Sequence, residues 1–191
     1  GYNVLVTEAE KKGILTLCGF KKGQEEANLS NKKLDPMDAK LIARELTSGF
    51  VSASLTKLKL ANFELPIDVL KTAAEVDLRN KALTDLDAII IATCMNVSAS
   101  MKKIKVNKCE LPIDVLKTGV QVDLSGRYLK VEDVIIIAAC IKFSSSMTSV
   151  DLSSNQLTRR AKKSSAPRWR NKAADFETDI TGSNAIAAAL S

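Results

Sequence analysis

Apolar residues recur along this chain in a short pattern that repeats at two alternating steps. The pattern is an apolar residue, any residue, a second apolar residue and then a leucine five residues later, and it begins at Ala27, Leu58, Val76, Ile104, Val122 and Val150. After a first step of 31 residues, steps of 18 and 28 residues alternate. Because alternation of apolar and other positions over a few residues is typical of β-strands, the pattern predicts six short strands in six successive turns of the chain.

A longer duplication joins these turns in pairs. The nine residues ELPIDVLKT at Glu64–Thr72 recur unchanged at Glu110–Thr118, an offset of 46 residues. The same offset relates Leu58 to Ile104 and Cys94 to Cys140. One turn of 18 and one of 28 residues therefore form a single duplicated unit.

Helix start signals follow the strands of the longer turns. Pro36 after Asp35 is suited to a first helical position, and Thr84 with Asp87 resembles a capping box. The 18-residue turns have no room for a full helix, so the LPIDVLKT stretch is expected to be one short helical turn or extended chain.

The turns resemble leucine-rich repeats, whose signature is LxxLxLxxN/CxL. Two turns match it in full, through Met101, Ile104, Val106, Cys109 and Leu111, and through Met147, Val150, Leu152, Asn155 and Leu157. The other turns depart at the Asn/Cys position, which holds Lys32, Phe63, Lys81 and Arg127. The 28-residue turns are similar to the ribonuclease-inhibitor-like subclass.

The resemblance implies an α/β fold over residues 24–158. It is a curved leucine-rich repeat solenoid with a parallel β-sheet on the concave side and helices or short turns on the convex side. Residues 1–23 are then an N-terminal capping or extension segment, and residues 159–182 a basic insertion or flexible loop. Residues 183–191 are a possible last repeat or capping helix.

Polar side chains are predicted on the open face of the strands. The concave interaction face consists of Lys59, Asp77, Arg79, Lys105, Asn107, Asp123, Ser125, Asp151 and Ser153. Two interpretations remain open for it. Charges of alternating sign on neighbouring strands form a ladder that neutralises itself, or the face binds a partner, as the concave surfaces of repeat proteins do.

The helices are predicted to have a second, apolar outer face. In the first helix the inward positions are Ala39, Ile42, Ala43 and Leu46, with Lys40, Leu41, Arg44 and Glu45 outside. The same phase in the next two helices leaves a convex docking patch of Ile89, Ile90, Cys94, Ile135, Ile136 and Cys140. Such a patch indicates a docking surface, because soluble monomers seldom expose one. The alternative is that the helical phase differs, or that neighbouring helices bury these side chains.

The net charge of +6 arises in one segment. Residues 159–172 hold seven basic residues and no acidic one, which leaves 28 − 7 = 21 basic against 22 acidic residues elsewhere. This basic segment contains Arg159, Arg160, Lys162, Lys163, Arg168, Trp169, Arg170 and Lys172. It is a solvated loop, or it binds an acidic protein or an anionic membrane surface, or it binds nucleic acid.

Several kinds of chemistry are excluded or disfavoured. The chain has no histidine, which excludes Ser-His-Asp and Cys-His catalysis and histidine zinc sites within it. Its four cysteines form no CxxC pair, which favours free thiols and a reducing compartment, either the cytoplasm or an organelle interior such as a chloroplast. No glycine-rich phosphate loop is present, and no cofactor or metal is expected. Apolar runs are too short for a transmembrane helix.

These observations predict a non-enzymatic protein-protein interaction scaffold or a structural subunit of a larger assembly. Docking is expected through the convex helix face, the concave strand face or both. A resemblance to repeat proteins of single-celled algae and other protists implies one or more protein partners in an organellar or photosynthetic complex. The alternative is a nucleic-acid or anionic-membrane-associated protein anchored by residues 159–172, with nucleic acid the less favoured ligand. Since the chain starts at Gly1, a processed or partial chain is expected.

Overall fold

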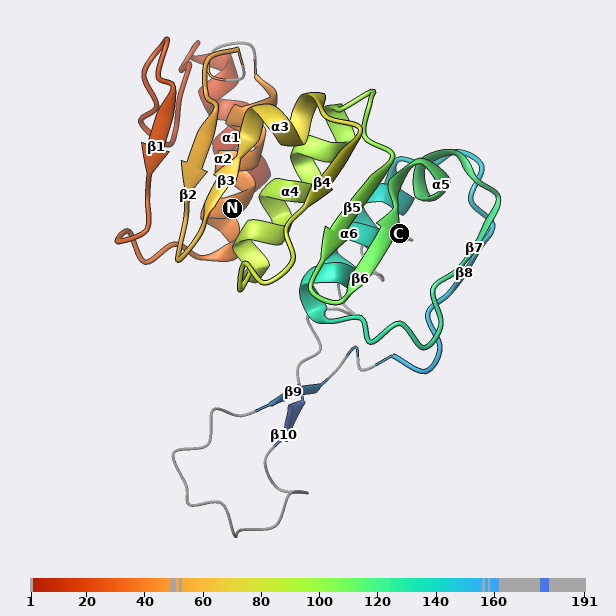
Figure 1. Ribbon diagram of the computed structural model, residues 1–191. Coiled ribbons are helices and arrows are strands. Elements are labelled where there is room, and N and C mark those ends of the chain that lie inside the picture. The colour runs from red at the N-terminus through yellow and green to blue at the C-terminus, as the bar shows by residue number, and fades with distance from the viewer. Residues whose placement is uncertain are drawn as a thin grey trace, which may run out of the picture.

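The protein is an α/β protein in which strands and helices alternate and the strands form short mixed sheets (Figure 1). The computed structural model describes residues 2–48, 51, 53–155, 157, 159–161 and 176–178, the last two ranges as backbone only. Predictions for residues 162–172 and 183–191 therefore lie outside the described residues.

The described chain contains two complete structural units and part of a third. The first unit consists of β1 (Glu26–Asn28), α2 (Pro36–Thr47), β2 (Lys57–Lys59), β3 (Glu64–Pro66) and α3 (Ile67–Thr72). The second consists of β4 (Glu75–Asp77), α4 (Asp85–Val97), β5 (Lys103–Val106), β6 (Cys109–Pro112) and α5 (Ile113–Thr118). The third consists of β7 (Gln121–Asp123), α6 (Val131–Lys142) and β8 (Ser149–Asp151). Helix α1 (Tyr2–Lys11) precedes the units, and β9 (Arg159–Ala161) and β10 (Phe176–Thr178) follow them.

Each unit pairs its first two strands in parallel around a long helix. β1 pairs with β2, β4 with β5 and β7 with β8, so all six strands predicted from the apolar pattern are present. In the first two units a hairpin then adds an antiparallel strand, with Leu65 opposite Leu58 and Leu111 opposite Ile104. This third strand occupies the edge at which the next unit would pair, so the single parallel sheet expected for these units is wrong.

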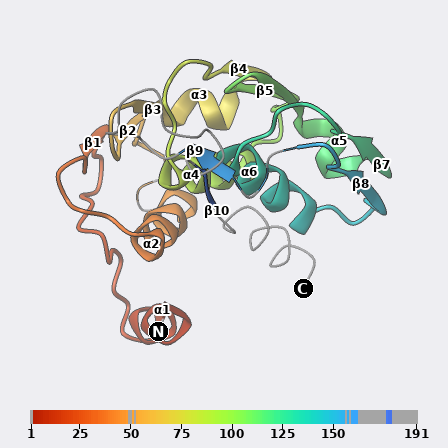
Figure 2. The same cartoon turned by 90° about the horizontal axis from the view of Figure 1, so that it is seen from below.

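The three long helices form a row on one side of the strands. Helix α4 lies between α2 and α6 and contacts both. Seen from below, the strands and the short helices α3 and α5 follow the outer side of an arch, and α2, α4 and α6 lie on its inner side (Figure 2). The strand side is longer because each complete unit places three strands and a short helix there against one long helix. The predicted concave strand face and convex helix face are therefore reversed.

Helix starts follow the predicted signals. Asp35 caps α2 with Pro36 at the first helical position, and Thr84 and Asp87 form the capping box of α4. The LPIDVLKT stretches form a short strand followed by a six-residue helix, α3 or α5, in agreement with the expected short helical turn.

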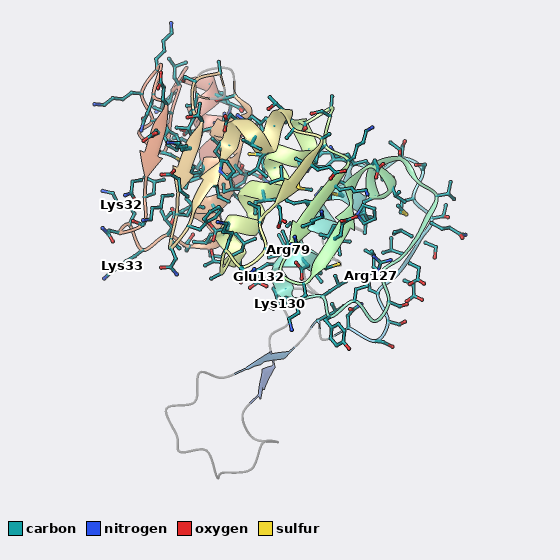
Figure 3. The ribbon with its side chains drawn as sticks, in the orientation of Figure 1. Lys32, Lys33, Arg79, Arg127, Lys130 and Glu132 are labelled. Atoms are coloured by element: carbon teal, nitrogen blue, oxygen red, sulfur yellow. The ribbon has the colours of Figure 1, made fainter. Side chains whose placement is uncertain are left out.

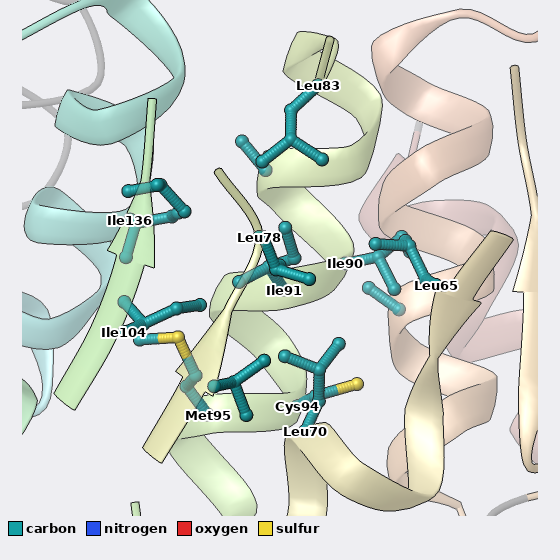
Figure 4. Packing of buried hydrophobic residues seen from close by; sticks show 14 of the residues in the cluster. Leu65, Leu70, Leu78, Leu83, Ile90, Ile91, Cys94, Met95, Ile104 and Ile136 are labelled. Atoms are coloured by element: carbon teal, nitrogen blue, oxygen red, sulfur yellow. The ribbon is translucent and has the colours of Figure 1, made fainter. Parts of the chain in front are cut away.

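Packing of the helices overturns the predicted docking patch. Ile90, Cys94, Ile136 and Cys140 are fully buried, whereas Ile89 and Ile135 are partly buried. In Figure 4, Ile90 and Cys94 lie beside Leu65 and Leu70 of the first unit, on the side of α4 that faces α2. A helix that contacts a helix on each side and strands below it is buried around most of its circumference. Of the four isoleucines that one apolar stripe leaves outside, Ile90 and Ile136 are core residues, and Ile89 and Ile135 pack against the core while partly exposed.

The residues of α2 that were predicted to face inward are buried, but one residue that was predicted to face solvent is buried as well. Ala39, Ile42, Ala43 and Leu46 are buried, and so is Glu45, which is 1% exposed. The Glu45 carboxylate accepts hydrogen bonds from the Thr16 hydroxyl at 2.6 Å, the Leu17 backbone N–H and the Cys18 backbone N–H at 2.9 Å. This buried carboxylate anchors the segment between α1 and β1 to α2.

Candidate interaction surface

Four strands end in an outward-facing polar residue, and in each case its side chain accepts the same kind of hydrogen bond from the backbone that follows. The side-chain oxygens of Asn28, Asp77, Asp123 and Asp151 accept from the backbone N–H two residues later, at 2.8–3.1 Å. These Asx turns direct the chain out of the sheet. Three of the predicted interaction residues, Asp77, Asp123 and Asp151, therefore have a structural role that the sequence analysis missed, although the repeated Asx-Leu-x triplet could have revealed it.

Loops from the first strand of each unit to its long helix have the same length and share one left-handed residue. They span residues 29–35, 78–84 and 124–130. Lys33, Ala82 and Tyr128, each two residues before the helix cap, have φ of 48°, 47° and 59°. This left-handed conformation is uncommon for residues other than glycine, so its recurrence at one position marks a repeated turn rather than three unrelated loops.

Exposed basic side chains lie at the tips of these loops. The loop edge consists of Lys32, Lys33, Arg79, Lys81, Arg127 and Lys130 on these loops, together with Lys108 on the neighbouring β5–β6 hairpin, and all seven are exposed. Figure 3 shows the labelled members along one edge of the molecule. Lys32, Lys81 and Arg127 occupy the Asn/Cys position of the repeat signature, so the departures from the signature are the residues presented to solvent. Only Arg79 of this set is among the predicted site residues.

Nearby carboxylates are largely engaged in local structure. The Asp35 and Asp38 side chains bond to backbone N–H groups at the start of α2. The Asp77 carboxylate takes two bonds from Arg79 Nε, at 3.0 and 3.1 Å, and one from Nη2 at 2.6 Å, and this pairing lowers the pKa of Asp77 to about 2. Glu132 also lies on this edge, beside Lys130 (Figure 3), so the edge carries an excess of cations over free carboxylates.

An open hollow of about 420 Å³ lies between the second loop and the β5–β6 hairpin. It is lined by Asp77, Arg79, Asn80, Asn107 and Lys108. The structure thus brings three predicted interaction residues, Asp77, Arg79 and Asn107, to one place. Lys105 is the register partner of Asp77 on the neighbouring strand.

The predicted charge ladder is confirmed only between Asp77 and Lys105, which are register partners, and it is interrupted elsewhere because the sheets are separate. Lys59 and Asp77 belong to different sheets, and the cations of β2 and β5 pair with acids within their own sheets, as Lys57 does with Glu26 of β1 at 2.7 Å. Lys57 lies 3.9 Å from Glu64, and Lys105 lies 3.7 Å from Glu110. In the third unit no lysine takes part, and Asp123 is the direct register partner of Asp151.

Two buried carboxylates at equivalent positions have different surroundings. The Asp133 carboxylate accepts from the Lys130 backbone N–H at 2.8 Å and from Asn107 Nδ2 at 2.9 Å, and burial raises its pKa to about 6. Asp87 accepts from the backbone and hydroxyl of Thr84 through one oxygen, while its Oδ1 has no hydrogen-bond partner. Burial raises its pKa as well. Both residues close capping boxes, as the sequence indicates for Asp87.

Cysteine chemistry is not favoured at any of the four positions. All four thiols are unpaired, and Cys94, Cys109 and Cys140 are buried. Burial raises the pKa of Cys94 to about 11 and of Cys140 to about 12, and burial together with Glu45 raises that of Cys18 to about 12. Thiols with raised pKa values are poor nucleophiles at neutral pH.

The basic segment is described only where β9 lies. Arg159 and Arg160 belong to β9, which pairs antiparallel with β10. Lys162, Lys163, Arg168, Trp169, Arg170 and Lys172 lie outside the described residues. The segment therefore keeps its three interpretations.

Within the described part of the chain, no helix is long and apolar enough to cross a membrane, and no group of three or more His, Cys, Asp or Glu residues is placed to hold a metal ion. Comparisons with family models, curated proteins and solved structures gave no match to this chain.

Proposed function

We propose that the chain is a non-enzymatic scaffold, a subunit of a larger protein assembly, whose loop edge binds an acidic surface of a partner protein. The single observation that carries this proposal is the row of exposed cations on three loops of equal length, each with a left-handed residue two positions before the helix cap. A repeated frame that fixes successive loops at one edge is how repeat proteins build extended binding surfaces. Loops held on a rigid scaffold commonly carry binding residues.

The frame itself is proposed to be a variant of the leucine-rich repeat solenoid. Strand–helix–strand units of regular length support this assignment. So does Asn155 at the signature position, whose Nδ2 donates to the Leu124 and Leu152 carbonyls at 2.9 Å each and so ties two turns together. The hairpin strands β3 and β6 are its departures from a single parallel sheet.

Charge favours an anionic partner at this edge. The exposed lysines and arginines point from loops that lead directly into α2, α4 and α6. The amino-terminal ends of helices carry partial positive charge, which adds to the attraction for anions. Lys81 Nζ also lies 5.1 Å from the centre of the Phe63 ring, which restricts one of these cations.

Charge reversal at the loop edge tests the proposal. Full-length chain carrying Lys32→Glu, Lys81→Glu and Arg127→Glu is titrated with fluorescently labelled poly-L-glutamate, an acidic polypeptide, and binding is followed by anisotropy. We expect the affinity to fall by about tenfold or more, because opposite charges across an interface are replaced by like charges.

A matched variant separates the edge from net charge. Lys21→Glu, Lys22→Glu and Lys102→Glu make the same change at exposed residues that precede β1 and β5, at the other ends of those strands. This control should lose less than about twofold. Equal losses in the two variants would refute a localised site. Tighter binding of duplex DNA or phosphatidylserine vesicles than of poly-L-glutamate, lost in the loop-edge variant, would replace the protein partner by those ligands.

A further inference from the structure

The third unit has an open strand edge where the first two units have a hairpin strand. Strand β2 pairs with β3 and β5 with β6, whereas β8 pairs with β7 alone among the described residues. The 46-residue offset places residues 155–158 at the position of β6, and the described residues there, 155 and 157, are not in a strand. Among the described residues, the outer edge of β8 therefore has no strand equivalent to β3 or β6.

Backbone groups on this edge point away from β7. The Ser149 N–H donates to the Val120 carbonyl and the Asp151 carbonyl accepts from the Leu124 N–H, so residues 149 and 151 face β7. Because alternate residues of a strand face opposite edges, the N–H and carbonyl of Val150 face outward. The equivalent Ile104 is paired with Leu111 of β6.

One further acceptor is defined by the same comparison. In the first two units the carbonyls of Thr56 and Lys102 accept from the N–H groups of Ile67 and Ile113, at 2.7 and 2.8 Å. The equivalent carbonyl in the third unit is that of Thr148. The Leu152 carbonyl is already bonded to Asn155, so an added strand would meet Thr148 and Val150.

Apolar side chains behind this edge are less covered than their equivalents. Leu58 and Ile104 are fully buried, but Val150 is only partly buried. The hairpin helices supply the missing cover in the earlier units, where Ile113 and Leu116 of α5 are buried. The offset replaces these two residues by Arg159 and Lys162 in the third unit, which are poor candidates for the same apolar sites.

Charge specifies the missing strand. In the second unit an acid of the hairpin strand, Glu110, lies opposite Lys105. In the third unit the position of Lys105 is taken by Asp151, which stands beside Asp123. An opposite charge directly across an antiparallel pair is favourable and a like charge is not, so the complementary strand carries a cation opposite Asp151.

We propose that the outer edge of β8 binds an extended peptide segment of a partner protein by strand addition. The segment runs antiparallel to β8 and has a lysine or arginine opposite Asp151 and an aliphatic residue opposite Val150. Main-chain hydrogen bonds to Val150 and Thr148 supply affinity, and the two side-chain positions supply specificity. The site lies at the end of the row of units and uses none of the loop-edge residues.

A peptide taken from the chain's own hairpin tests the proposal. The probe is a 12-residue peptide with the sequence of residues 107–118 in which Cys109 is replaced by Ser and Glu110 by Lys. A matched peptide keeps Glu110. With the full chain we expect the lysine peptide to bind about tenfold more tightly than the glutamate peptide at low salt, because only the lysine complements Asp151. The Asp151→Lys variant should reverse this preference.

Two changes to the backbone separate strand pairing from simple charge attraction. N-methylation of the peptide leucine that derives from Leu111 removes the N–H that would donate to the Val150 carbonyl and leaves the protein unchanged. Val150→Pro removes the outward N–H from the edge strand without touching the bonds to β7. Each change should abolish binding of the lysine peptide, whereas the loop-edge substitutions should leave it intact.

Three results would overturn the proposal. Equal affinity of the two peptides would remove the role of Asp151, and full binding of the N-methylated peptide would remove the backbone pairing. A dimer of the unliganded chain in light scattering, converted to monomer by Val150→Pro, would assign the edge to a second copy of the chain instead.

Discussion

Asp133 is a buried carboxylate that accepts one of its hydrogen bonds from a residue distant in sequence, Asn107. Burial is the largest influence on its pKa and raises it from 3.8 to about 6, while bonds from the Lys130 backbone and the Asn107 side chain oppose the rise. Because the folded state holds this proton more tightly than the unfolded state, folding stability from this group is full below about pH 4 and is lost as the pH rises through about 6. The difference amounts to about 3 kcal/mol.

Removal of the amide should increase this penalty. Asn107→Gly deletes the donor, and glycine accepts the φ of 51° at this position without strain. We expect the pKa of Asp133 to rise above about 6, as measured by carbon-13 NMR titration of the side-chain carboxyl. The free energy of unfolding should fall by about 1–3 kcal/mol at pH 7.5 and by less at pH 5, where Asp133 is protonated.

Asp87 provides the control within the same molecule. It occupies the equivalent capping position but its Oδ1 has no partner, so its titration should not change in Asn107→Gly. An unchanged Asp133 midpoint would mean that the amide does not stabilise the charge.

The sequence predicts the contacts of the buried carboxylates only where the partner is a few residues away in the chain. Thr84 and Asp87 are three residues apart and form a recognisable box. Asn107 reaches Asp133 across 26 residues from a hairpin loop, and Glu45 binds residues 16–18 across 27 to 29 residues. Nothing in the local pattern marks either contact, so Glu45 was assigned to the solvent side.

At the scale of the element, the prediction of an exposed outer face on α4 is wrong because it assumes that the helix packs against one layer only. Helix α4 packs against a helix on each side, and Ile90 is fully buried on the side that faces α2, while Ile89 is only partly buried. We expect Ile90→Ala to lower the free energy of unfolding by about 2–5 kcal/mol, because it leaves a cavity in the core. Ile89→Ala should cost about 1 kcal/mol, because the site is already open to water. Urea denaturation measures both.

Adjacent isoleucines on one helix make the comparison internally controlled, since both substitutions remove the same atoms and change helix propensity equally. Light scattering of the two variants and the unsubstituted chain distinguishes the rival view. If Ile90→Ala leaves the free energy of unfolding unchanged and converts an oligomer to a monomer, then Ile90 is a docking residue.

The duplicated ELPIDVLKT stretch shows what an element pattern can and cannot predict. Its short helix was expected because 18 residues cannot hold a long one. Its strand was expected at most as extended chain, because strands of three residues (β3, ending at Pro66) and four residues (β6, ending at Pro112) have too few alternating positions to be recognised. Pairing with β2 or β5 through Leu65 or Leu111 depends on the turn that precedes it, which is a tertiary property.

At the scale of the whole molecule, this one strand decides the shape. The six strands, their order and the long helices could be predicted from spacing, but the curvature could not, because it depends on whether successive units share a sheet. Hairpin strands interrupt the sheet and widen the strand side, which turns the arch the other way (Figure 2). The loop-edge cations were visible as Lys32, Lys81 and Arg127, yet they gained significance only when the loops proved to lie along one edge.

The same arrangement predicts a gradient of local stability along the row of units. The Leu78 N–H donates to the Lys105 carbonyl at 2.7 Å, and the equivalent Leu124 N–H donates to Asp151 at 2.8 Å. Both leucines are buried, so the two bonds differ chiefly in their surroundings. The second unit has neighbours on both sides and a third strand, whereas the third unit has neither on its far side within the described residues.

Native-state hydrogen exchange followed by NMR measures this gradient. We expect the Leu124 amide to exchange at least about tenfold faster than that of Leu78, since local opening of a less supported sheet costs less free energy. Equal protection would mean that the units unfold as one cooperative block and that the open edge carries no instability. Because a ligand stabilises only the state that binds it, saturation with the lysine peptide should slow exchange at Leu124 and leave Leu78 unchanged. A peptide that slowed both equally would be bound elsewhere.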